Sequence, residues 1–338
     1  MPYEPVSGGW GTHPPAPDYS LQQQYDSFRR SEYALLRKHG NCVGLCVVAM
    51  FLLQYGLTLL LLLFDPGDLH ENCVAFNHAV SAIFYSVISL FVPFLLLSLK
   101  KGSPRYIGVL PFSASHSRLK VVLVIMAGFG VCMFSDLIAT FVSDLIHNAG
   151  LKELNAEQPV SAAPFDFVLN VLCTAMMPAM VEEFVFRGVI MQPLRRYGEH
   201  FAVWSSAILF GLMHGTLTSF AFAFPVGVIL GYAAVLTGSL WPGIVIHFLN
   251  NFYAVIVTDL GGVNAQAAES LSSVILYIGI FLGAGALVFL VMTRSFRLEK
   301  RATQAMMKGK RFKGFFMSVP MLISVAALIF FMVIVNLD

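Results

Sequence analysis

The chain has 338 residues, of which 57% are hydrophobic and only 12% are charged, and its formal net charge at pH 7 is +2. An ordinary soluble domain carries roughly a quarter charged residues, so this composition excludes a soluble enzyme and indicates a membrane protein. The small net charge gives no reason to expect a nucleic-acid partner. The five cysteines are scattered and lack the paired spacing of a metal site.

The first forty residues differ from the rest of the chain. They are rich in Pro, Gly, Gln and Tyr, and they lack the charged-then-apolar pattern of a cleaved signal peptide. We therefore expect residues 1–40 to form a polar, disordered cytoplasmic tail that stays on the mature protein. Residues 41–338 are expected to form one helical membrane domain.

Apolar runs close to the ~20 residues needed to cross a bilayer recur along this domain. One run, between Glu199 and Asp259, contains no Asp, Glu, Lys or Arg at all, and is too long for a single helix. Gly, Ser, Thr and Pro in "HGTLTS" and "LTGSLWPG" divide it into three. The sequence thus predicts an all-α, polytopic membrane fold of about eight to nine spans, at 43–64, 74–99, 121–142, 165–190, 201–214, 219–236, 239–258, 271–293 and 316–335.

The basic residues predict the orientation of these spans, because cytoplasmic loops collect Lys and Arg. With the N-terminus inside, twenty of the 21 Lys and Arg fall on the cytoplasmic side, and only Lys152 falls outside. Outer connections such as "DPGDLHEN" are acidic or neutral. We expect an integral protein of a bacterial plasma membrane with a cytoplasmic N-terminus, and the basic linker 294–313 is read as a topology anchor with anionic lipid as a secondary partner.

Three charges stand inside the apolar segment "VEEFVFRGVI", residues 181–190. Charged side chains within a spanning helix cost about 2.5–3.5 kcal/mol each on insertion scales, so they need a reason. Glu183 and Arg187 are four residues apart and share a helix face, where they can neutralise one another. Glu182 is rotated by about 100° from its neighbour, so this pairing does not explain it.

Two further polar clusters follow on later helices. "FGLMHG" places His214 one turn after Phe210, and "HFLNNF" places Asn251 one turn after His247. Counting about 1.5 Å per residue from the predicted cytoplasmic helix ends puts Glu182, His214, His247 and Asn251 into one layer of the membrane. Asn250 points elsewhere on its helix and is expected to make an interhelical hydrogen bond.

A carboxylate, two imidazoles and a carboxamide at one depth are suited to hydrolysis. Glu182, held by His214, can take a proton from water as a general base. His247 and the Asn251 amide are donors suited to the oxygen that becomes negative when water attacks a carbonyl. No serine or cysteine stands in a nucleophile motif.

At these residues the sequence resembles the CPBP family (CAAX proteases and bacteriocin-processing enzymes), also called the Abi family of intramembrane proteases. The family motifs EExxxR, FxxxH and HxxxN occur in order as Glu182-Glu183 to Arg187, Phe210 to His214, and His247 to Asn251. The resemblance covers a catalytic core at about 165–258.

The resemblance implies a helical fold with an active-site cavity open toward the cytosol, and an endopeptidase of glutamate or metallo type. Its substrate is expected to be a membrane-associated protein or peptide, lipidated in the CAAX prenyl protease branch. Carried over, Glu182 and His214 activate water, His247 and Asn251 form the oxyanion site, and Glu183, Arg187 and Phe210 support them. Zn²⁺ on Glu182, His214 and His247 stays open as a cofactor, although the HExxH pattern that makes zinc an easy inference is absent.

Other interpretations of the same residues remain. The charges at 182–187 can be a purely structural ion network, and His214 can be a hydrogen-bonded core histidine. The chain as a whole can be a non-catalytic membrane scaffold or an immunity or binding protein that keeps the pocket without turnover. A transporter is less favoured, because it requires polar groups along a path or an internal repeat, and neither is visible in the sequence.

Overall fold

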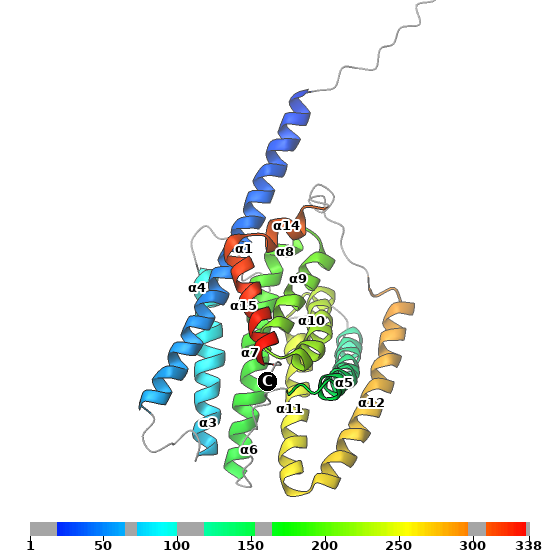
Figure 1. Ribbon diagram of the computed structural model, residues 1–338. Coiled ribbons are helices and arrows are strands. Elements are labelled where there is room, and N and C mark those ends of the chain that lie inside the picture. Colours follow the sequence, from blue (N-terminus) through cyan, green and yellow to red (C-terminus); the bar gives the residue numbers. More distant parts are fainter. Residues whose placement is uncertain (1–18, 65–72, 100–117, 153–163, 297–308, 336–338) are drawn as a thin grey trace, which may run out of the picture.

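The computed structural model describes residues 19–64, 73–99, 118–152, 164–296 and 309–335. Within these ranges every regular element is a helix (Figure 1). Seven of these helices are long and apolar enough to cross a membrane, and a shorter apolar helix covers Val319–Ile334. The predicted fold class is confirmed, and the chain is a polytopic helical membrane protein.

The N-terminal part contributes a long helix, α1, followed by two further rods. The elements are α1 (Tyr19–Phe64), α3 (Val74–Ser81), the π-helical segment η1 (Ala82–Phe91), α4 (Val92–Leu99) and α5 (Arg118–Asn148). α3, η1 and α4 follow one another without a break, so they form one rod that matches the predicted span 74–99.

A second composite rod runs through the centre of the molecule. It consists of α6 (Pro164–Asn170), η2 (Val171–Met176), α7 (Met177–Glu182), η3 (Glu183–Ile190) and α8 (Met191–Arg195), with η2 and η3 in π-helical geometry. π-Helical turns are rare and occur frequently at functional sites. The first turn of η3 contains Glu183, directly after Glu182 at the end of α7.

The C-terminal half contains α9 (Glu199–Leu212), α10 (Leu217–Thr237), α11 (Trp241–Val263), α12 (Ala265–Met292), α14 (Arg311–Phe316) and α15 (Val319–Val335). The threefold division of the charge-free run is confirmed. The side chain of Thr216 caps α10 by accepting from the Ser219 amide, and Gly238, with φ +64°, ends it. α9 has only 14 residues, about 21 Å at 1.5 Å per residue, which is less than the ~30 Å hydrocarbon core of a bilayer.

The expected disordered tail is wrong for residues 19–40, because α1 begins at Tyr19. Its first turns are exposed and project beyond the bundle (Figure 1), whereas Glu32, Leu36 and His39 are buried. Composition misled the prediction. Residues 19–39 contain no Gly or Pro, and Leu21, Tyr25 and Phe28 follow one another at the spacing of four and three residues that one helix face requires. Residues 1–18 of the expected tail lie outside the described residues.

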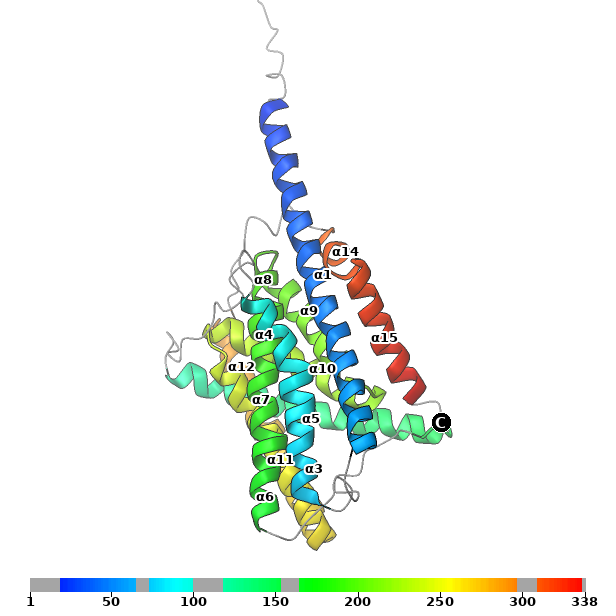
Figure 2. The same cartoon turned by 90° about the vertical axis from the view of Figure 1, so that its left-hand side faces the viewer.

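The C-terminal helix α15 packs along α1 (Figure 2). A Cβ on Gly44 of α1 would lie 2.4 Å from the backbone nitrogen of Met321, so only glycine permits this approach. The Ser324 hydroxyl donates to the Gly44 carbonyl at 2.8 Å. Small residues and hydroxyl groups are the usual means by which membrane helices pack closely.

An ion pair and hydrogen bonds join α1, the turn between α8 and α9, and α14 at one end of the bundle. Arg196 pairs with the buried Glu32 of α1, and the Tyr197 hydroxyl donates to the Glu32 carbonyl at 3.1 Å. Arg311 of α14 donates to the Tyr197 carbonyl at 2.8 Å. Burial, together with the charge of Glu32, raises the pKa of the Tyr197 hydroxyl, so it stays a neutral donor.

Candidate active site

Glu183 and Arg187 form a completely buried ion pair. Both side chains have 0% exposure, and Arg187 Nη1 donates to Glu183 Oε1 at 2.7 Å. Arg187 Nη2 donates to the Gly227 carbonyl of α10 at 3.0 Å, so the pair also connects η3 to a second helix. The predicted pairing of these two residues is confirmed.

The ring of Phe210 contacts Arg187 and both histidines of the site. The guanidinium carbon of Arg187 lies 4.5 Å from the Phe210 ring centroid. The rings of His214 and His247 meet the same phenyl ring edge-on, with centroids 4.8 and 5.9 Å away. A phenyl ring favours a cation on its face, and ring pairs prefer such tilted arrangements. These contacts explain why a phenylalanine stands at the first position of the FxxxH motif.

His247 lies between the two adjacent glutamates. Its Nδ1 is 3.4 Å from Glu183 Oε1, and its Nε2 is 3.9 Å from Glu182 Oε2. The imidazole is buried, whereas the Glu182 side chain keeps 21% exposure. Glu182 is thus the one carboxylate of this pair that can reach a solvent-filled space.

Gly243 allows the close approach of α11 to Glu183. A Cβ at this position would lie 2.7 Å from Glu183 Oε2. Gly243 is the third residue of α11, so the carboxylate lies against the N-terminal turn of a helix, where a negative charge is favoured. This explains why a glycine stands in "GSLWPG", one turn before His247.

His214 lies just after the C-terminal end of α9 and is held there by a backbone carbonyl. Its Nδ1 is 2.8 Å from the Phe210 carbonyl, which can only accept, so Nδ1 carries the hydrogen. In the neutral form Nε2 is therefore the nitrogen that can accept a proton or a hydrogen bond. The histidine follows α9 at the turn before α10 and is exposed.

The four predicted catalytic residues line one cavity of about 340 Å³. Its walls come from the central rod, from α11 and from the end of α9. The lining residues are Asn170, Thr174, Pro178, Glu182, His214, His247, Asn251, Ala254, Val255 and Thr258. The structure therefore brings Glu182, His214, His247 and Asn251 together.

The cavity extends from Glu182 and His247 toward Asn170 and Thr258. Those two residues lie near the end of the bundle formed by α6 and the C-terminal turns of α11, opposite α8 and α14 (Figure 1). Under the predicted topology this is the outer side of the membrane. The direction differs from the cytosolic opening that the family resemblance implies.

Polar side chains donate hydrogen bonds to backbone carbonyls of the π-helical segments η2 and η3. In η3, Ser206 donates to Phe186 at 2.8 Å and Gln192 donates to Arg187 at 2.8 Å. Asn251 Nδ2 donates to the Thr174 carbonyl of η2 at 3.4 Å. These bonds fix the central rod where its hydrogen-bonding pattern departs from an α-helix.

Within the described residues, Asn250 does not make the interhelical bond expected of it. Its amide donates to Asn251 Oδ1, its neighbour in α11, at 3.3 Å. The bond orients the Asn251 carboxamide so that its nitrogen faces Thr174. Asn250 thus supports the cavity residue next to it.

The expected zinc ligands do not form a ligand set. Among the described residues, no group of three or more His, Cys, Asp and Glu side chains is arranged to hold a metal ion. The residues as arranged do not fit the tetrahedral site that Zn²⁺ requires.

Residues 164–253 match the family model "Type II CAAX prenyl endopeptidase Rce1-like". The resemblance to the CPBP family is confirmed. All seven motif residues lie within this Rce1-like segment, and the cavity residues Ala254, Val255 and Thr258 follow directly after it.

A curated relative agrees with this match. The chain is 24% identical over 140 residues to "Putative membrane peptidase YdiL" of Bacillus subtilis (strain 168), an alignment that covers 40% of this chain and 56% of that protein. The chain thus spans little more than half the length of the relative it matches. No solved structure matches the chain.

Several residues beside the motifs were missed by sequence reasoning. Asn170, Thr174 and Thr258 line the cavity, and Gly227 and Gly243 shape the surroundings of the ion pair. A helical-face count from Glu182 backward in steps of four reaches Pro178, Thr174 and Asn170, and would have found this wall. The roles of Gly227 and Gly243 could not be predicted in this way, because they depend on which helices pack against each other in the folded protein.

Proposed function

We propose that the protein is an intramembrane endopeptidase related to CAAX prenyl proteases. The observation that carries the proposal is the convergence of Glu182, His214, His247 and Asn251, from three parts of the fold, on one cavity. The match of residues 164–253 to an Rce1-like endopeptidase family supports it. Ionisable groups at membrane depth are themselves the signature of a functional site.

In the proposed reaction, Glu182 acts as the general base. Its Oε2 has no hydrogen-bond partner among the described residues, and its side chain lines the cavity. A water molecule held by Glu182 and by His214 Nε2 gives a proton to the carboxylate while its oxygen bonds to the peptide carbonyl carbon. The C–N bond then breaks, and the proton passes from Glu182 to the leaving amine.

His247 and Asn251 stabilise the negative oxygen that forms on the carbonyl. When His247 carries both ring protons, Nδ1–H is bonded to Glu183 and Nε2–H is free to donate into the cavity. Two positive charges, on Arg187 and His247, then balance the two glutamates, so the buried cluster has no net charge. Fixed donors in a water-poor site are worth about 2.7–4 kcal/mol each in transition-state stabilisation.

Glu183 and Arg187 position these groups and do not take part in the chemistry themselves. Glu183 Oε1 accepts from both Arg187 and His247, so the ion pair sets the orientation of the imidazole. Arg187 in turn contacts Phe210, whose carbonyl holds His214. Through this chain of contacts one buried pair orients both histidines.

The substrate in this proposal is a membrane-associated protein or peptide, and a lipidated one is in keeping with the family description. The protein is proposed to lie in a bacterial plasma membrane with a cytoplasmic N-terminus, which the one-sided basic residues support. A bacterial relative with a peptidase name supports the same location.

The test is cleavage by wild type and by Glu182→Gln. Membrane peptides from cells that carry either form are compared by mass spectrometry, and a candidate substrate is then cleaved by purified protein. We expect one precursor to accumulate with Glu182→Gln, whereas the control Glu269→Gln, an exposed glutamate on α12, behaves as wild type. Cleavage retained by purified Glu182→Gln contradicts the mechanism, and a wild-type phenotype that survives in this variant favours a non-catalytic scaffold.

Chelation addresses the metal alternative with the same assay. Because the described side chains do not form a metal site, we expect cleavage to continue in excess EDTA. Loss of cleavage with EDTA and its recovery on adding Zn²⁺ would show that the ligand set rearranges to hold zinc.

A further inference from the structure

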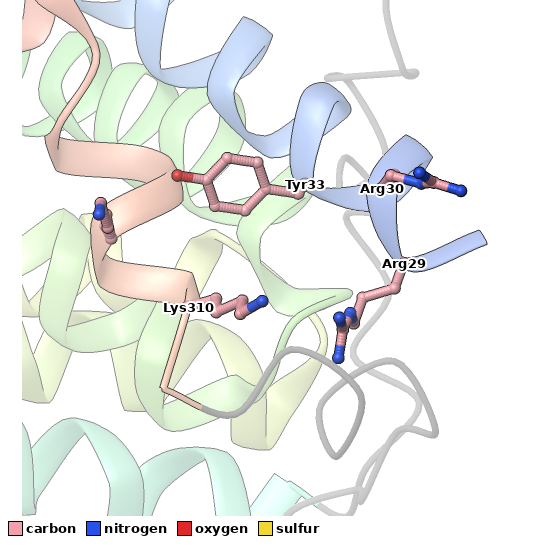
Figure 3. A pocket seen from close by; sticks show the side chains of 5 residues that line it. Arg29, Arg30, Tyr33 and Lys310 are labelled. Atoms are coloured by element: carbon pink, nitrogen blue, oxygen red, sulfur yellow. The ribbon is translucent and has the colours of Figure 1, made fainter. Parts of the chain in front are cut away.

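A second cavity, of about 300 Å³, lies at the opposite end of the molecule from α6. It is lined by Arg29, Arg30 and Tyr33 of α1 and by Lys310 and Lys313 at α14 (Figure 3). Tyr33 extends from α1 toward α14, and Arg29 and Lys310 stand on the two sides of the space between the helices. No part of the proposed peptidase site contributes to it.

The charge around this basic cavity is unbalanced. Four of its five lining residues are cationic. Asp26 pairs with Arg29 at 3.5 Å, and the buried Glu32 is already paired with Arg196. In the part of the chain that the structure describes, no ion pair is recorded for Arg30, Lys310 or Lys313. Such a cluster repels itself unless an anion lies within it.

The two walls of the cavity are held at a fixed distance. A Cβ on Gly314 of α14 would lie 3.0 Å from Leu36 and 3.2 Å from Tyr33, so α14 rests directly on α1. Arg311, next to Lys310, is tied to the Tyr197 carbonyl and stacks over Phe201, with its guanidinium carbon 5.6 Å from the ring centroid. The lysines of α14 are therefore presented from a docked helix.

The position of the cavity suits the surface of a membrane. α14 ends at Phe316 and the apolar helix α15 begins at Val319, so the lysines stand just before the chain enters apolar surroundings. Phe312 on α14 is 53% exposed and Phe28 on α1 is 43% exposed, and each is next in the chain to a basic residue that lines the cavity. Exposed aromatic side chains beside Lys and Arg are typical of the headgroup layer.

We propose that this basic cavity binds the phosphate group of an anionic phospholipid headgroup. Arginine binds phosphate oxygens through paired N–H donors and lysine adds a point charge, while the Tyr33 hydroxyl is a further donor. Phe312, exposed beside Lys313, is the aromatic side chain available to the acyl chains. The bound lipid bridges α1 and α14 and so stabilises the docking of the C-terminal helices on α1. The inference does not depend on the proposed peptidase activity.

The experiment measures lipid retained by the purified full-length protein in detergent. Native mass spectrometry counts bound phosphatidylglycerol and phosphatidylcholine, and a thermal unfolding assay records the shift in Tm that each lipid and inorganic phosphate produce. Lys310→Gln/Lys313→Gln removes two charges from the cavity. Arg118→Gln/Arg294→Gln removes two exposed charges that do not line it and is the matched control.

Wild type is expected to retain phosphatidylglycerol in preference to phosphatidylcholine and to gain Tm with it. Each charge removed should weaken binding by about fivefold, from the ~1 kcal/mol that a basic residue contributes near an anionic surface. Lys310→Arg/Lys313→Arg should bind as wild type, and so should the control. Equal binding by Lys310→Gln/Lys313→Gln overturns the proposal. A Tm shift reproduced by millimolar inorganic phosphate alone overturns the assignment to a lipid.

Discussion

The guanidinium of Arg187 lies over the ring of Phe210, with its central carbon 4.5 Å from the ring centroid. Through this contact the EExxxR segment of the central rod meets the FxxxH segment of α9. The same ring touches the imidazoles of His214 and His247. One phenyl ring thus contacts the guanidinium of the buried ion pair and the imidazoles of both histidines.

Replacing this ring with an aliphatic side chain should therefore disturb stability and activity together. We expect Phe210→Leu to lower the free energy of unfolding by about 2 kcal/mol, because the desolvated cation–π contact and the edge-on ring contacts are lost. The rate of cleavage should fall by more than the lost fraction of folded protein explains, because both imidazoles lose their contact with the Phe210 ring. Thermal unfolding in detergent and a cleavage assay measure the two effects.

A matched control for Phe210 lies on α11. Phe252 stacks on Phe248 with ring centroids 5.5 Å apart and does not line the site. Phe252→Leu should leave the rate of cleavage unchanged. Equal loss of cleavage in both variants would remove the special role given to Phe210.

The ion pair of Glu183 and Arg187 predicts a non-additive response to mutation. Glu183→Gln leaves the fully buried guanidinium without its counter-charge, which typically costs about 3–5 kcal/mol. Glu183→Gln/Arg187→Met removes both charges and should regain most of that stability. Cleavage should stay low in the double variant, because His247 Nδ1 has lost its carboxylate acceptor.

Unfolding midpoints of Glu183→Gln, of Arg187→Met and of the double variant provide the measurement. We expect the double variant to have a higher unfolding midpoint than Glu183→Gln. If the two single effects simply add, the pair does not interact in the way that its 2.7 Å contact indicates.

Much of the candidate site could be predicted from the sequence, because charge is so rare in this chain. Glu183 and Arg187 stand out in an apolar run, and their spacing of four residues defines one helical face. The layer of Glu182, His214 and His247 followed from helix geometry alone. The cavity that joins them agrees with that calculation.

The parts that sequence did not predict depend on long-range packing or on backbone geometry. No local pattern indicates that η3 is π-helical, or that Ser206 and Gln192 bind its carbonyls. The helical start at Tyr19 was missed because composition describes a segment in isolation, whereas Leu36 and His39 are buried by other helices. Tertiary contacts of this kind override local preference.

The close approach at Gly243 predicts sensitivity to a single methyl group. Gly243→Ala places a carbon 2.7 Å from Glu183 Oε2, and the carboxylate must shift away from His247 to make room. The better helix propensity of alanine, worth about 1 kcal/mol, offsets part of the resulting loss in stability. Cleavage should fall at least tenfold, because the orientation of the imidazole depends on this carboxylate.

Gly285 on α12 is the control for this substitution. In the described part of the chain, no other helix comes within 4 Å of a Cβ placed there, so Gly285→Ala should keep wild-type cleavage and stability. The two variants are compared by thermal unfolding and by cleavage rate. Full activity in Gly243→Ala would show that the Glu183 carboxylate can move without effect on the site.

The extent of the cavity predicts where a substrate lies. Ala254 lines the cavity one turn beyond Asn250 on α11, on the part that runs toward Thr258 and Asn170. If the substrate occupies this part, Ala254→Trp should block its entry and abolish cleavage while the unfolding temperature stays within a few degrees of wild type. Leu249→Trp, on the same helix but outside the cavity lining, should remain active. Undiminished cleavage by Ala254→Trp would instead place the substrate on the side of Glu182 that faces α8, and the cavity beyond Asn251 would then serve only to admit water.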